Sequence, residues 1–463
     1  MSDIYPLLVL LVGIISIIGM IVILRLNAFI ALITSAMLVS LLAPGALAEK
    51  ISRVAFAFGS ATGNIGIVIG LAVVIGQCMM VSGAADRIVK SFLALLGEKR
   101  VSVALMSSGF VLSIPVFFDT VFYLLVPLAR SMYRQTGRHY LKYIMAICAG
   151  AVVTHSLVPP TPGPLIMADT FGIDMGLMIL VGILISLPAA AVGLLFGWWM
   201  DRKMDLPMRP VAGEEEESRQ MDVEKLPNLM MSLMPIALPV LLVSLNTIVN
   251  TFYAPVGGQN ANSAFIGIIS IIGNVNFAML AATAVAMWTL VRTRDFTLKE
   301  MALTVEQALM SGGVIILITA GGGAFGAMLK AAEVGPAIES LFAGSSGEPS
   351  NGVFLIILSF LIASVMKISQ GSGTVAMITT SAMMASMIPS TESLSFHPVY
   401  LATAIGGGSM FGTWMNDSAF WIFAKMGGFT EVETLKTWTL LVAVIGFTAF
   451  LTSLLLAVVL PLT

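Results

Sequence analysis

The chain has 463 residues and only 48 charged side chains, 23 Lys and Arg against 25 Asp and Glu. Soluble domains carry about 25% charged residues. This chain has 10%, with 58% hydrophobic residues and a mean hydropathy of +0.98. The composition excludes a soluble protein, a disordered chain and a basic surface for nucleic acid, and it indicates a protein that crosses the lipid bilayer many times.

Charge-free stretches long enough to cross a bilayer of about 30 Å recur along the chain. The first, residues 4–24, lacks a basic segment in front of it, so we expect a retained helix and not a cleaved signal. The others are 26–48, 54–85, 143–168, 175–200, 226–291 (divided at 255–262), 307–329 and 437–463.

Two further apolar segments, 101–129 and 350–391, are interrupted by polar residues, Gly and Pro. If both are re-entrant hairpins, 19 of the 23 Lys and Arg residues fall on the cytoplasmic side and three outside. Full crossings would give about 14 and 8. Because basic residues accumulate in cytoplasmic loops, the hairpins are favoured, and both termini are expected in the periplasm.

With the two hairpins assigned, the predicted spans form two halves with the same order of elements. We expect a first repeat at 1–205, an acidic cytoplasmic linker at 206–227 and a second repeat of opposite orientation at 228–463. Each repeat has a broken span after its hairpin, at about 143–168 and 399–424. The predicted fold is an all-α polytopic membrane protein with two inverted-topology repeats, about ten full transmembrane helices and two re-entrant hairpins. This is the architecture of secondary transporters.

Four polar breaks fall at equivalent places in the two repeats, at 114–120, 154–163, 367–374 and 413–418. Irregular backbone inside a bilayer is tolerated only where protein buries it or water lines it, and exposed helix N-termini attract anions. Kinks that served only helix packing would not be expected at four paired positions. We therefore interpret the breaks as parts of a substrate site.

Ionisable side chains deep in a bilayer cost at least about 2.5 kcal/mol each and are functional candidates. Asp119 is predicted to carry a co-transported proton, since an apolar setting favours the neutral carboxyl group; a fixed structural acceptor is the alternative. Asp417 is interpreted equally as a proton-coupling residue or a helix cap. Lys367 is expected to counter a substrate carboxylate, or else to pair permanently with an aspartate. His155 is a candidate ligand or a satisfied hydrogen-bonding residue.

Neutral polar side chains at the same breaks suit a polyhydroxylated ligand, although they could also cap the hairpin tips. The predicted substrate-binding set is completed by Thr154, Thr161, Ser369, Gln370, Ser372, Thr374 and Asn416. The glycine runs 321–323 and 406–408 have no phosphate-binding context and are attributed to close helix packing. Cys78 and Cys148 lie in apolar stretches and form no disulfide or zinc pattern, and no metal or resident cofactor is expected.

These motifs resemble the gluconate permease (GntP, gluconate:H+ symporter) family of the ion transporter superfamily over nearly the whole chain. The resemblance implies proton-coupled uptake of a sugar acid such as gluconate across the bacterial inner membrane. It also implies a homodimer of the elevator type, in which a moving part carries the hairpins. The motifs that carry it are Val116-Phe-Phe-Asp-Thr120, Leu125-Val-Pro127, Val153-Thr-His-Ser-Leu-Val-Pro-Pro-Thr-Pro-Gly-Pro164, Gly321-Gly-Gly-Ala-Phe325, Gly371-Ser-Gly-Thr-Val-Ala376 and Asn416-Asp-Ser-Ala-Phe-Trp421.

Three positions depart from the family pattern. Asp119 stands where a Glu is expected, Lys367 where an Arg is expected, and Thr161 replaces His in a Pro-Pro-His-Pro motif. These side chains differ in length and geometry from those of the family pattern, so the identity of the transported carboxylate stays open. The alternatives include a related hydroxy-carboxylate and a hydroxylated amino acid such as D-serine. Carbonyls at the breaks also leave Na+ coupling open.

A second class is a proton-conducting subunit of an energy-coupling complex, which predicts continuous helices with ionisable residues strung along the membrane midplane. An enzyme or an ATP-driven pump is not expected, because the chain has no protease motif and no P-loop.

Overall fold

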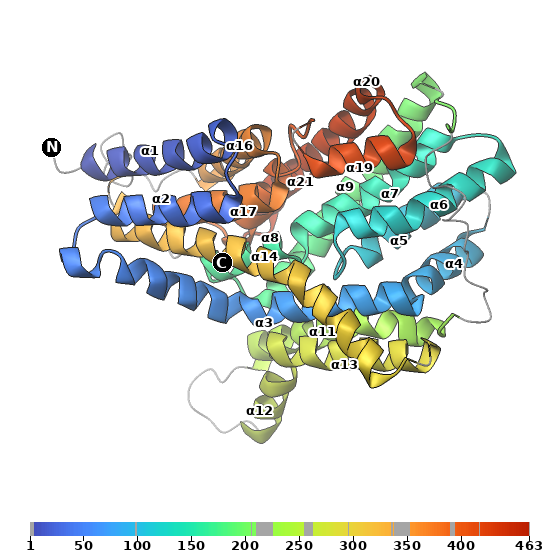
Figure 1. Cartoon of the computed structure of the whole chain (residues 1–463), viewed down its shortest axis with the longest axis horizontal. Helices are drawn as coiled ribbons and strands as arrows, with labels where there is room; N and C mark the ends of the chain where they lie inside the picture. The colour runs from blue at the N-terminus through green and yellow to red at the C-terminus, as the bar shows by residue number, and fades with distance from the viewer. Residues whose placement is uncertain are drawn as a thin grey trace.

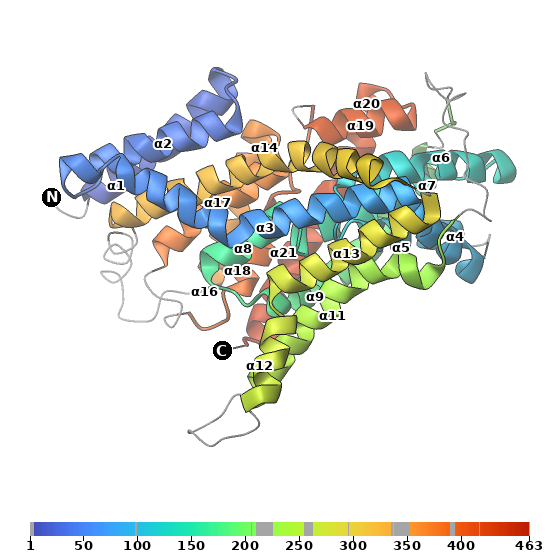
Figure 2. The same cartoon turned by 60° about the horizontal axis from the view of Figure 1, so that its bottom comes forward.

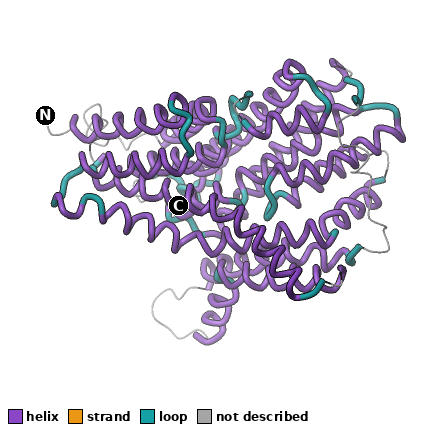
Figure 3. The backbone as a smooth tube through the Cα atoms, in the orientation of Figure 1, coloured by secondary structure: helices purple, strands orange, loops and turns teal. Residues whose placement is uncertain are grey.

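The computed structural model is built of helices, and no strand occurs in the part of the chain that it describes (Figure 3). The predicted linker lies outside that part at 210–225, and so does the expected start of the second hairpin at 350–351. The described residues are 4–97, 100–204, 206–209, 226–253, 263–294, 296–334, 337, 352–388, 394–415 and 417–462.

Among the described residues of the first half there are nine α-helices, several of them separated by very short turns. Gly83 and Gly137 end helices with positive φ angles of 79° and 66°, a conformation that glycine adopts without strain. The helices are α1 (Ile4–Ile18, continued by a π-helical turn, Gly19–Ile23), α2 (Ala28–Leu42), α3 (Ser52–Ser82), α4 (Ala84–Leu96), α5 (Val101–Leu112), α6 (Phe118–Thr136), α7 (Tyr140–Leu157), α8 (Pro162–Phe171) and α9 (Met175–Met204).

Figure 1 also shows the helices in the described part of the second half. They are α11 (Leu229–Tyr253), α12 (Ser263–Ile272), α13 (Val275–Arg294), α14 (Leu298–Ala331), α16 (Gly352–Gln370), α17 (Gly373–Met387), α18 (Val399–Gly408), α19 (Ser418–Gly427), α20 (Glu431–Thr434) and α21 (Leu440–Val459). A π-helical turn, Leu435–Thr439, joins α20 to α21. Figure 2 shows α12 projecting from the side formed by α11 and α13.

Seven helical stretches among the described residues are long and apolar enough to cross a membrane. They are Leu47–Ser82, Tyr140–Phe171, Met175–Met204, Leu229–Val249, Val275–Arg294, Leu298–Ala331 and Glu431–Val459. The all-α, multi-pass character of the chain is thereby confirmed, whereas the number of full spans and the inverted relation of the repeats remain predictions.

Two predicted spans have different bounds in the structure. The span expected from residue 307 begins at Leu298, because Thr297 and Glu300 form a capping box that adds a polar first part to α14. The span expected at 437–463 begins inside the π-helical turn Leu435–Thr439, which hydropathy does not reveal, and the helical stretch itself begins at Glu431. The apolar pattern therefore did not predict the polar first part of α14 or the π-helical turn.

Both interrupted segments are pairs of helices. Residues 113–117 separate α5 from α6, and Gly371, with a φ of 81°, and Ser372 separate α16 from α17. In Figure 1, α16 and α17 lie to the left of the centre and α5 and α6 to the right. The two broken spans also break, α7 from α8 at 158–161 and α18 from α19 at 409–417.

The glycine runs let one helix touch three others. In α14, the run 321–323 faces Leu32 of α2, Ile378 of α17 and Ala61 of α3 in succession. A Cβ atom on the middle glycine would lie 1.8 Å from Ile378. In α18, the run 406–408 faces α7, α21 and α16 in the same way. The prediction that these runs serve close helix packing is confirmed.

A second tightly packed region joins the end of α9 to the α19–α20 turn. The Arg209 guanidinium donates two hydrogen bonds to the Glu433 carboxylate, at 2.6 and 2.7 Å, and a third to the Gly428 carbonyl. The hydrogen bonds to Glu433 raise the pKa of Arg209. Arg130 of α6 donates to the Arg209 carbonyl at 2.7 Å. Arg209 thus ties the segment that follows α9 to both α6 and α20.

Candidate substrate site

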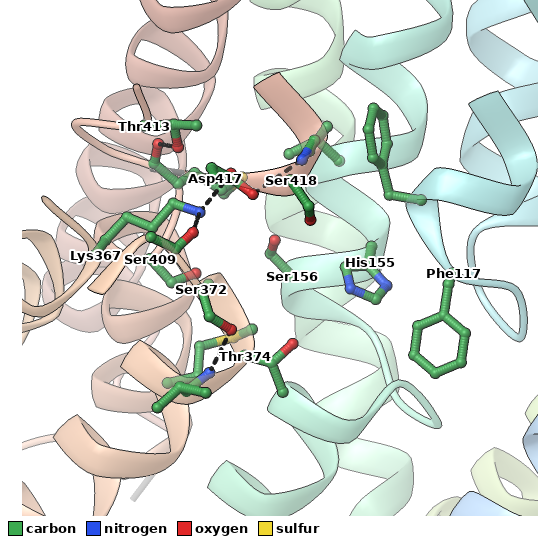
Figure 4. A pocket seen from close by; sticks show the side chains of 18 of the residues that line it. Phe117, His155, Ser156, Lys367, Ser372, Thr374, Ser409, Thr413, Asp417 and Ser418 are labelled. Carbon is green, nitrogen blue, oxygen red and sulfur yellow. Dashed lines mark hydrogen bonds and ion pairs between the residues drawn. The ribbon is translucent and has the colours of Figure 1, made fainter. Parts of the chain in front are cut away.

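A cavity of about 570 Å³ lies where the two hairpin turns meet the two broken spans (Figure 4). Its walls combine aromatic and aliphatic side chains with hydroxyl groups and three ionisable groups besides one histidine. The lining residues are Phe117, Phe118, Asp119, Val152, His155, Ser156, Pro162, Ile315, Ile318, Thr319, Lys367, Gly371, Ser372, Gly373, Thr374, Val375, Met377, Ser409, Met410, Thr413, Asp417, Ser418, Ala419, Trp438 and Val442.

Four helices begin at this cavity. The first residues of α6, α8, α17 and α19, which are Phe118, Pro162, Gly373 and Ser418, all line it. Helix N-termini carry free N–H groups and the positive end of the helix dipole, so they favour an anion. The contribution of α8 is the weakest, because prolines at its first and third positions have no N–H.

Lys367 forms the buried ion pair of the site. Its side chain is 5% exposed, and Nζ lies 2.7 Å from Asp417 Oδ2 and donates to the Gly371 carbonyl at 2.7 Å. The other oxygen of Asp417 accepts from the Ala419 N–H at 3.1 Å and so caps α19. Asp417 is therefore both a helix cap and the partner of Lys367. A lysine ammonium has three N–H donors, and the two contacts leave one for a ligand.

Asp119 lies in the first turn of α6 and lines the same cavity. Its carboxylate has no hydrogen bond or ion pair with any described residue, and Lys367 and Asp417 are close enough to act on it electrostatically. The positive end of α6 partly offsets its charge. Of the two aspartates, Asp119 is thus the one without a bonding partner among the described residues.

His155 faces the cavity from the last turn of α7, across from Lys367 (Figure 4). Its ring packs edge-on against Phe117, with the centroids 5.8 Å apart. The Nδ1 atom is buried and has no hydrogen-bond partner among the described residues. A buried nitrogen without a partner is costly in a folded protein, so this side chain is suited to bind a ligand.

The predicted hydroxyl and amide residues fall into three groups. Ser372 and Thr374 line the cavity, and Ser372 also caps α17. The structure does not bring Thr154 and Thr161 into it: Thr154 Oγ1 donates to the Gly150 carbonyl, and Thr161 Oγ1 donates to the carbonyls of residues 155 and 158. Ser369 and Gln370 lie in the last turn of α16 with side chains outside the described part, and Asn416 lies outside it altogether.

The cavity is also lined by five hydroxyl residues that were not among the residues predicted from the sequence. They are Ser156, Thr319, Ser409, Thr413 and Ser418. Four of them sit in or beside a predicted break or glycine run, so proximity could have revealed them. Thr319 lies in the middle of an apolar helix, and nothing in the sequence around it indicates that it lines a cavity.

Three of these hydroxyls are oriented by hydrogen bonds to nearby backbone, one inside α14 and two in or at the start of the α18–α19 break. Thr319, Ser409 and Thr413 donate to backbone carbonyls at 2.6, 2.7 and 2.9 Å. Because the hydrogen is engaged there, each oxygen keeps lone pairs that can accept from a ligand hydroxyl. The cavity thus offers one cationic donor and several acceptors. No group of three residues that could hold a metal ion occurs among the described residues.

Relatives of the chain are found over its whole length. The family described as GntP family permease matches residues 5–459. A gluconate permease of Pseudomonas aeruginosa is 33% identical over 460 residues, covering 99% of each chain. The low-affinity gluconate transporter of Escherichia coli is 30% identical over 426 residues, covering 91% of each. An uncharacterised permease of Haemophilus influenzae is 32% identical and covers 92% of this chain and 87% of that protein.

Two solved structures share the fold at low sequence identity. Neisseria gonorrhoeae MtrF matches with a TM-score of 0.66 and 15% identity, covering 94% of this chain and 95% of that one. The Alcanivorax borkumensis YdaH transporter matches with a TM-score of 0.62 and 14% identity, covering 94% and 98%. The fold and the full-length family match lead to one conclusion: the chain belongs to the GntP family of permeases, and it is a multi-pass membrane transporter and not an enzyme.

Proposed function

We propose that the protein takes up a sugar acid such as gluconate, together with a proton, across the bacterial inner membrane. The observation that carries the proposal is the buried Lys367 ammonium in a hydroxyl-lined cavity where four helices begin. Relatives named as gluconate permeases at about 30% identity support the same substrate class.

In this proposal the substrate carboxylate lies beside the remaining N–H of Lys367 and the N-termini of α17 and α19. Gly373 permits this approach, since a Cβ atom there would lie 3.8 Å from Lys367 Nζ and 3.3 Å from the Ser409 carbonyl. The acceptor oxygens of Ser409 and Thr413 then take hydroxyl groups of the sugar chain. The site would then supply a cation for the carboxylate of an aldonate and acceptor oxygens for two of its hydroxyl groups.

The co-transported proton is assigned to Asp119. With Asp119 ionised and Lys367 paired to Asp417, the cavity carries one net negative charge, which opposes an incoming anion. Protonation of Asp119 removes that charge, so proton and substrate binding support one another. We further propose that both hairpins move as part of an elevator-type homodimer.

The substitution Asp119→Asn tests the coupling. It keeps the size of the side chain but cannot carry a proton, so accumulation of radiolabelled gluconate driven by a pH gradient in proteoliposomes should be lost. Exchange of gluconate between the two sides should persist. Asp169→Asn, an exposed aspartate outside the cavity lining, is the matched control. Unchanged accumulation in the Asp119 variant would show that the proton is carried elsewhere.

One observation favours a second candidate, a hydroxylated amino acid such as D-serine. The unpaired Asp119 carboxylate could bind a substrate ammonium in place of a proton. Thermal-shift measurements with gluconate and with D-serine, each with and without Na+, distinguish the two. Stabilisation by D-serine alone would replace the sugar-acid proposal.

A further inference from the structure

Trp438 is a cavity residue with an unusual backbone setting. It belongs to the π-helical turn Leu435–Thr439 in front of α21, and it lines the cavity while being only 2% exposed. π-helical turns are rare, appear mostly as single turns inside α-helices, and occur frequently at functional sites. Here the turn holds a large aromatic side chain at the wall next to the start of α6.

The ring of Trp438 is fixed by its neighbours. Its centroid lies 5.2 Å from that of Phe118 and 5.4 Å from that of Phe423. Phe118 directly precedes Asp119, and both residues line the same cavity as Trp438. The packing leaves the indole little freedom to turn toward another partner.

The indole N–H of Trp438 has no hydrogen-bond partner among the described residues. By contrast, Trp414 donates to the Ile368 carbonyl at 2.9 Å, and Trp421 donates to the Met415 carbonyl at 2.7 Å. Leaving a buried donor unsatisfied costs a factor of about 5 to 150 in an equilibrium constant. An indole nitrogen can only donate, so the partner that would relieve this cost is an acceptor oxygen.

We propose that Trp438 is a specificity-determining residue that donates its indole N–H to one hydroxyl oxygen of the sugar chain, away from the carboxylate. The inference rests on the proposed function and adds to it a contact that selects among sugar acids. A site that hydrogen-bonds a substrate hydroxyl strongly rejects the analogue that lacks it, because the buried group is then left unpaired. Lys367 would set the charge of the substrate and Trp438 the position of one hydroxyl.

The test compares gluconate with its single-deoxy analogues, each as an inhibitor of gluconate uptake in proteoliposomes. In the wild type, one analogue should bind about 10-fold or more weaker than gluconate. In Trp438→Phe, which keeps the ring and loses the N–H, this ratio should fall to within about 2-fold of unity. Trp438→His, which retains a ring N–H, should restore part of it. Trp288→Phe, a half-exposed tryptophan outside the cavity lining, should keep the wild-type ratio.

The outcomes separate the two proposals. A wild type that binds no sugar acid overturns the proposed function and this inference together. A wild type that discriminates while Trp438→Phe discriminates equally overturns only the inference, even if the variant binds everything more weakly. Should Trp438→Phe fail to fold, the indole N–H resonances of ¹⁵N-tryptophan-labelled wild type give the readout. Gluconate must then shift one resonance that the matching deoxy analogue leaves unchanged.

Discussion

Lys367 and Asp417 hold opposite charges at 2.7 Å inside a membrane protein, with side chains only 5% and 11% exposed. Removing one partner of such a pair leaves an uncompensated buried charge, whereas removing both does not. Losing either residue alone should therefore destabilise the protein more than losing both together. The ion pair also fixes the α18–α19 break to the tip of the second hairpin, since the two residues come from those two elements.

This pairing predicts strong coupling between substitutions. Lys367→Met or Asp417→Asn alone should each destabilise the protein by about 3–5 kcal/mol, while the double variant should lose much less than the sum. Thermal unfolding in detergent of the two single variants and the double variant measures the difference. Additive losses would mean that the ion pair contributes no interaction energy.

His397 gives a residue-scale prediction for pH. Burial lowers its pKa below the usual 6.5, and Asp174 opposes this only in part. A histidine with a lowered folded-state pKa binds fewer protons when folded than when unfolded, so its contribution to stability is present above pH 6.5 and is lost as the pH falls below it. His397→Gln should reduce the drop in melting temperature between pH 7 and pH 5. An identical drop in the variant would refute this assignment.

At the scale of elements, the breaks were predictable and the bonding inside them was not. Pro159, Pro160 and Gly163 mark the α7–α8 break directly in the sequence. Whether Thr154 and Thr161 face the ligand or bond to their own backbone depends on dihedral angles that a sequence pattern does not encode. The same holds for Thr319, where helix α14 turns one hydroxyl toward the cavity, and for the π-helical turn that positions Trp438.

The contact between α5 and α7 supplies a prediction about packing. A Cβ atom on Gly150 would lie 2.0 Å from the Met106 carbonyl oxygen, and backbone cannot move aside as a side chain can. Gly150→Ala should therefore destabilise the protein by about 1–3 kcal/mol or more. Gly313→Ala, where no atom lies within 4 Å, should be neutral or stabilising by up to about 1 kcal/mol. Equal melting temperatures for the two variants would contradict this packing.

For the whole molecule, the sorting of basic residues predicts which loops share a side of the membrane. Two of the three basic residues predicted on the outer side make local hydrogen bonds at the C-terminal end of α2: Arg53 donates to the Pro44 carbonyl and Lys50 to the Leu41 carbonyl. Cations at a helix C-terminus are stabilising, so these two have a structural reason to be there.

The orientation can be measured without first removing the native cysteines, because Cys78 and Cys148 are both buried. Leu47→Cys, at an exposed site on the side predicted to be periplasmic, should react with a membrane-impermeant maleimide in whole cells. Arg25→Cys, exposed on the side predicted to be cytoplasmic, should react only after the membrane is opened. The reverse pattern would invert the predicted topology.

The glycine run of α14 also limits how the helix can vary in length. Successive residues of an α-helix are about 100° apart around its axis, so three glycines in a row turn three sides of α14 toward α2, α17 and α3. One residue inserted before the run would rotate everything upstream, Thr319 included, by one such step relative to all three neighbours. Side-chain movement could not absorb that rotation. The contacts on three sides therefore fix the rotation of α14 about its axis. Homologues should differ there by substitution and not by insertion or deletion.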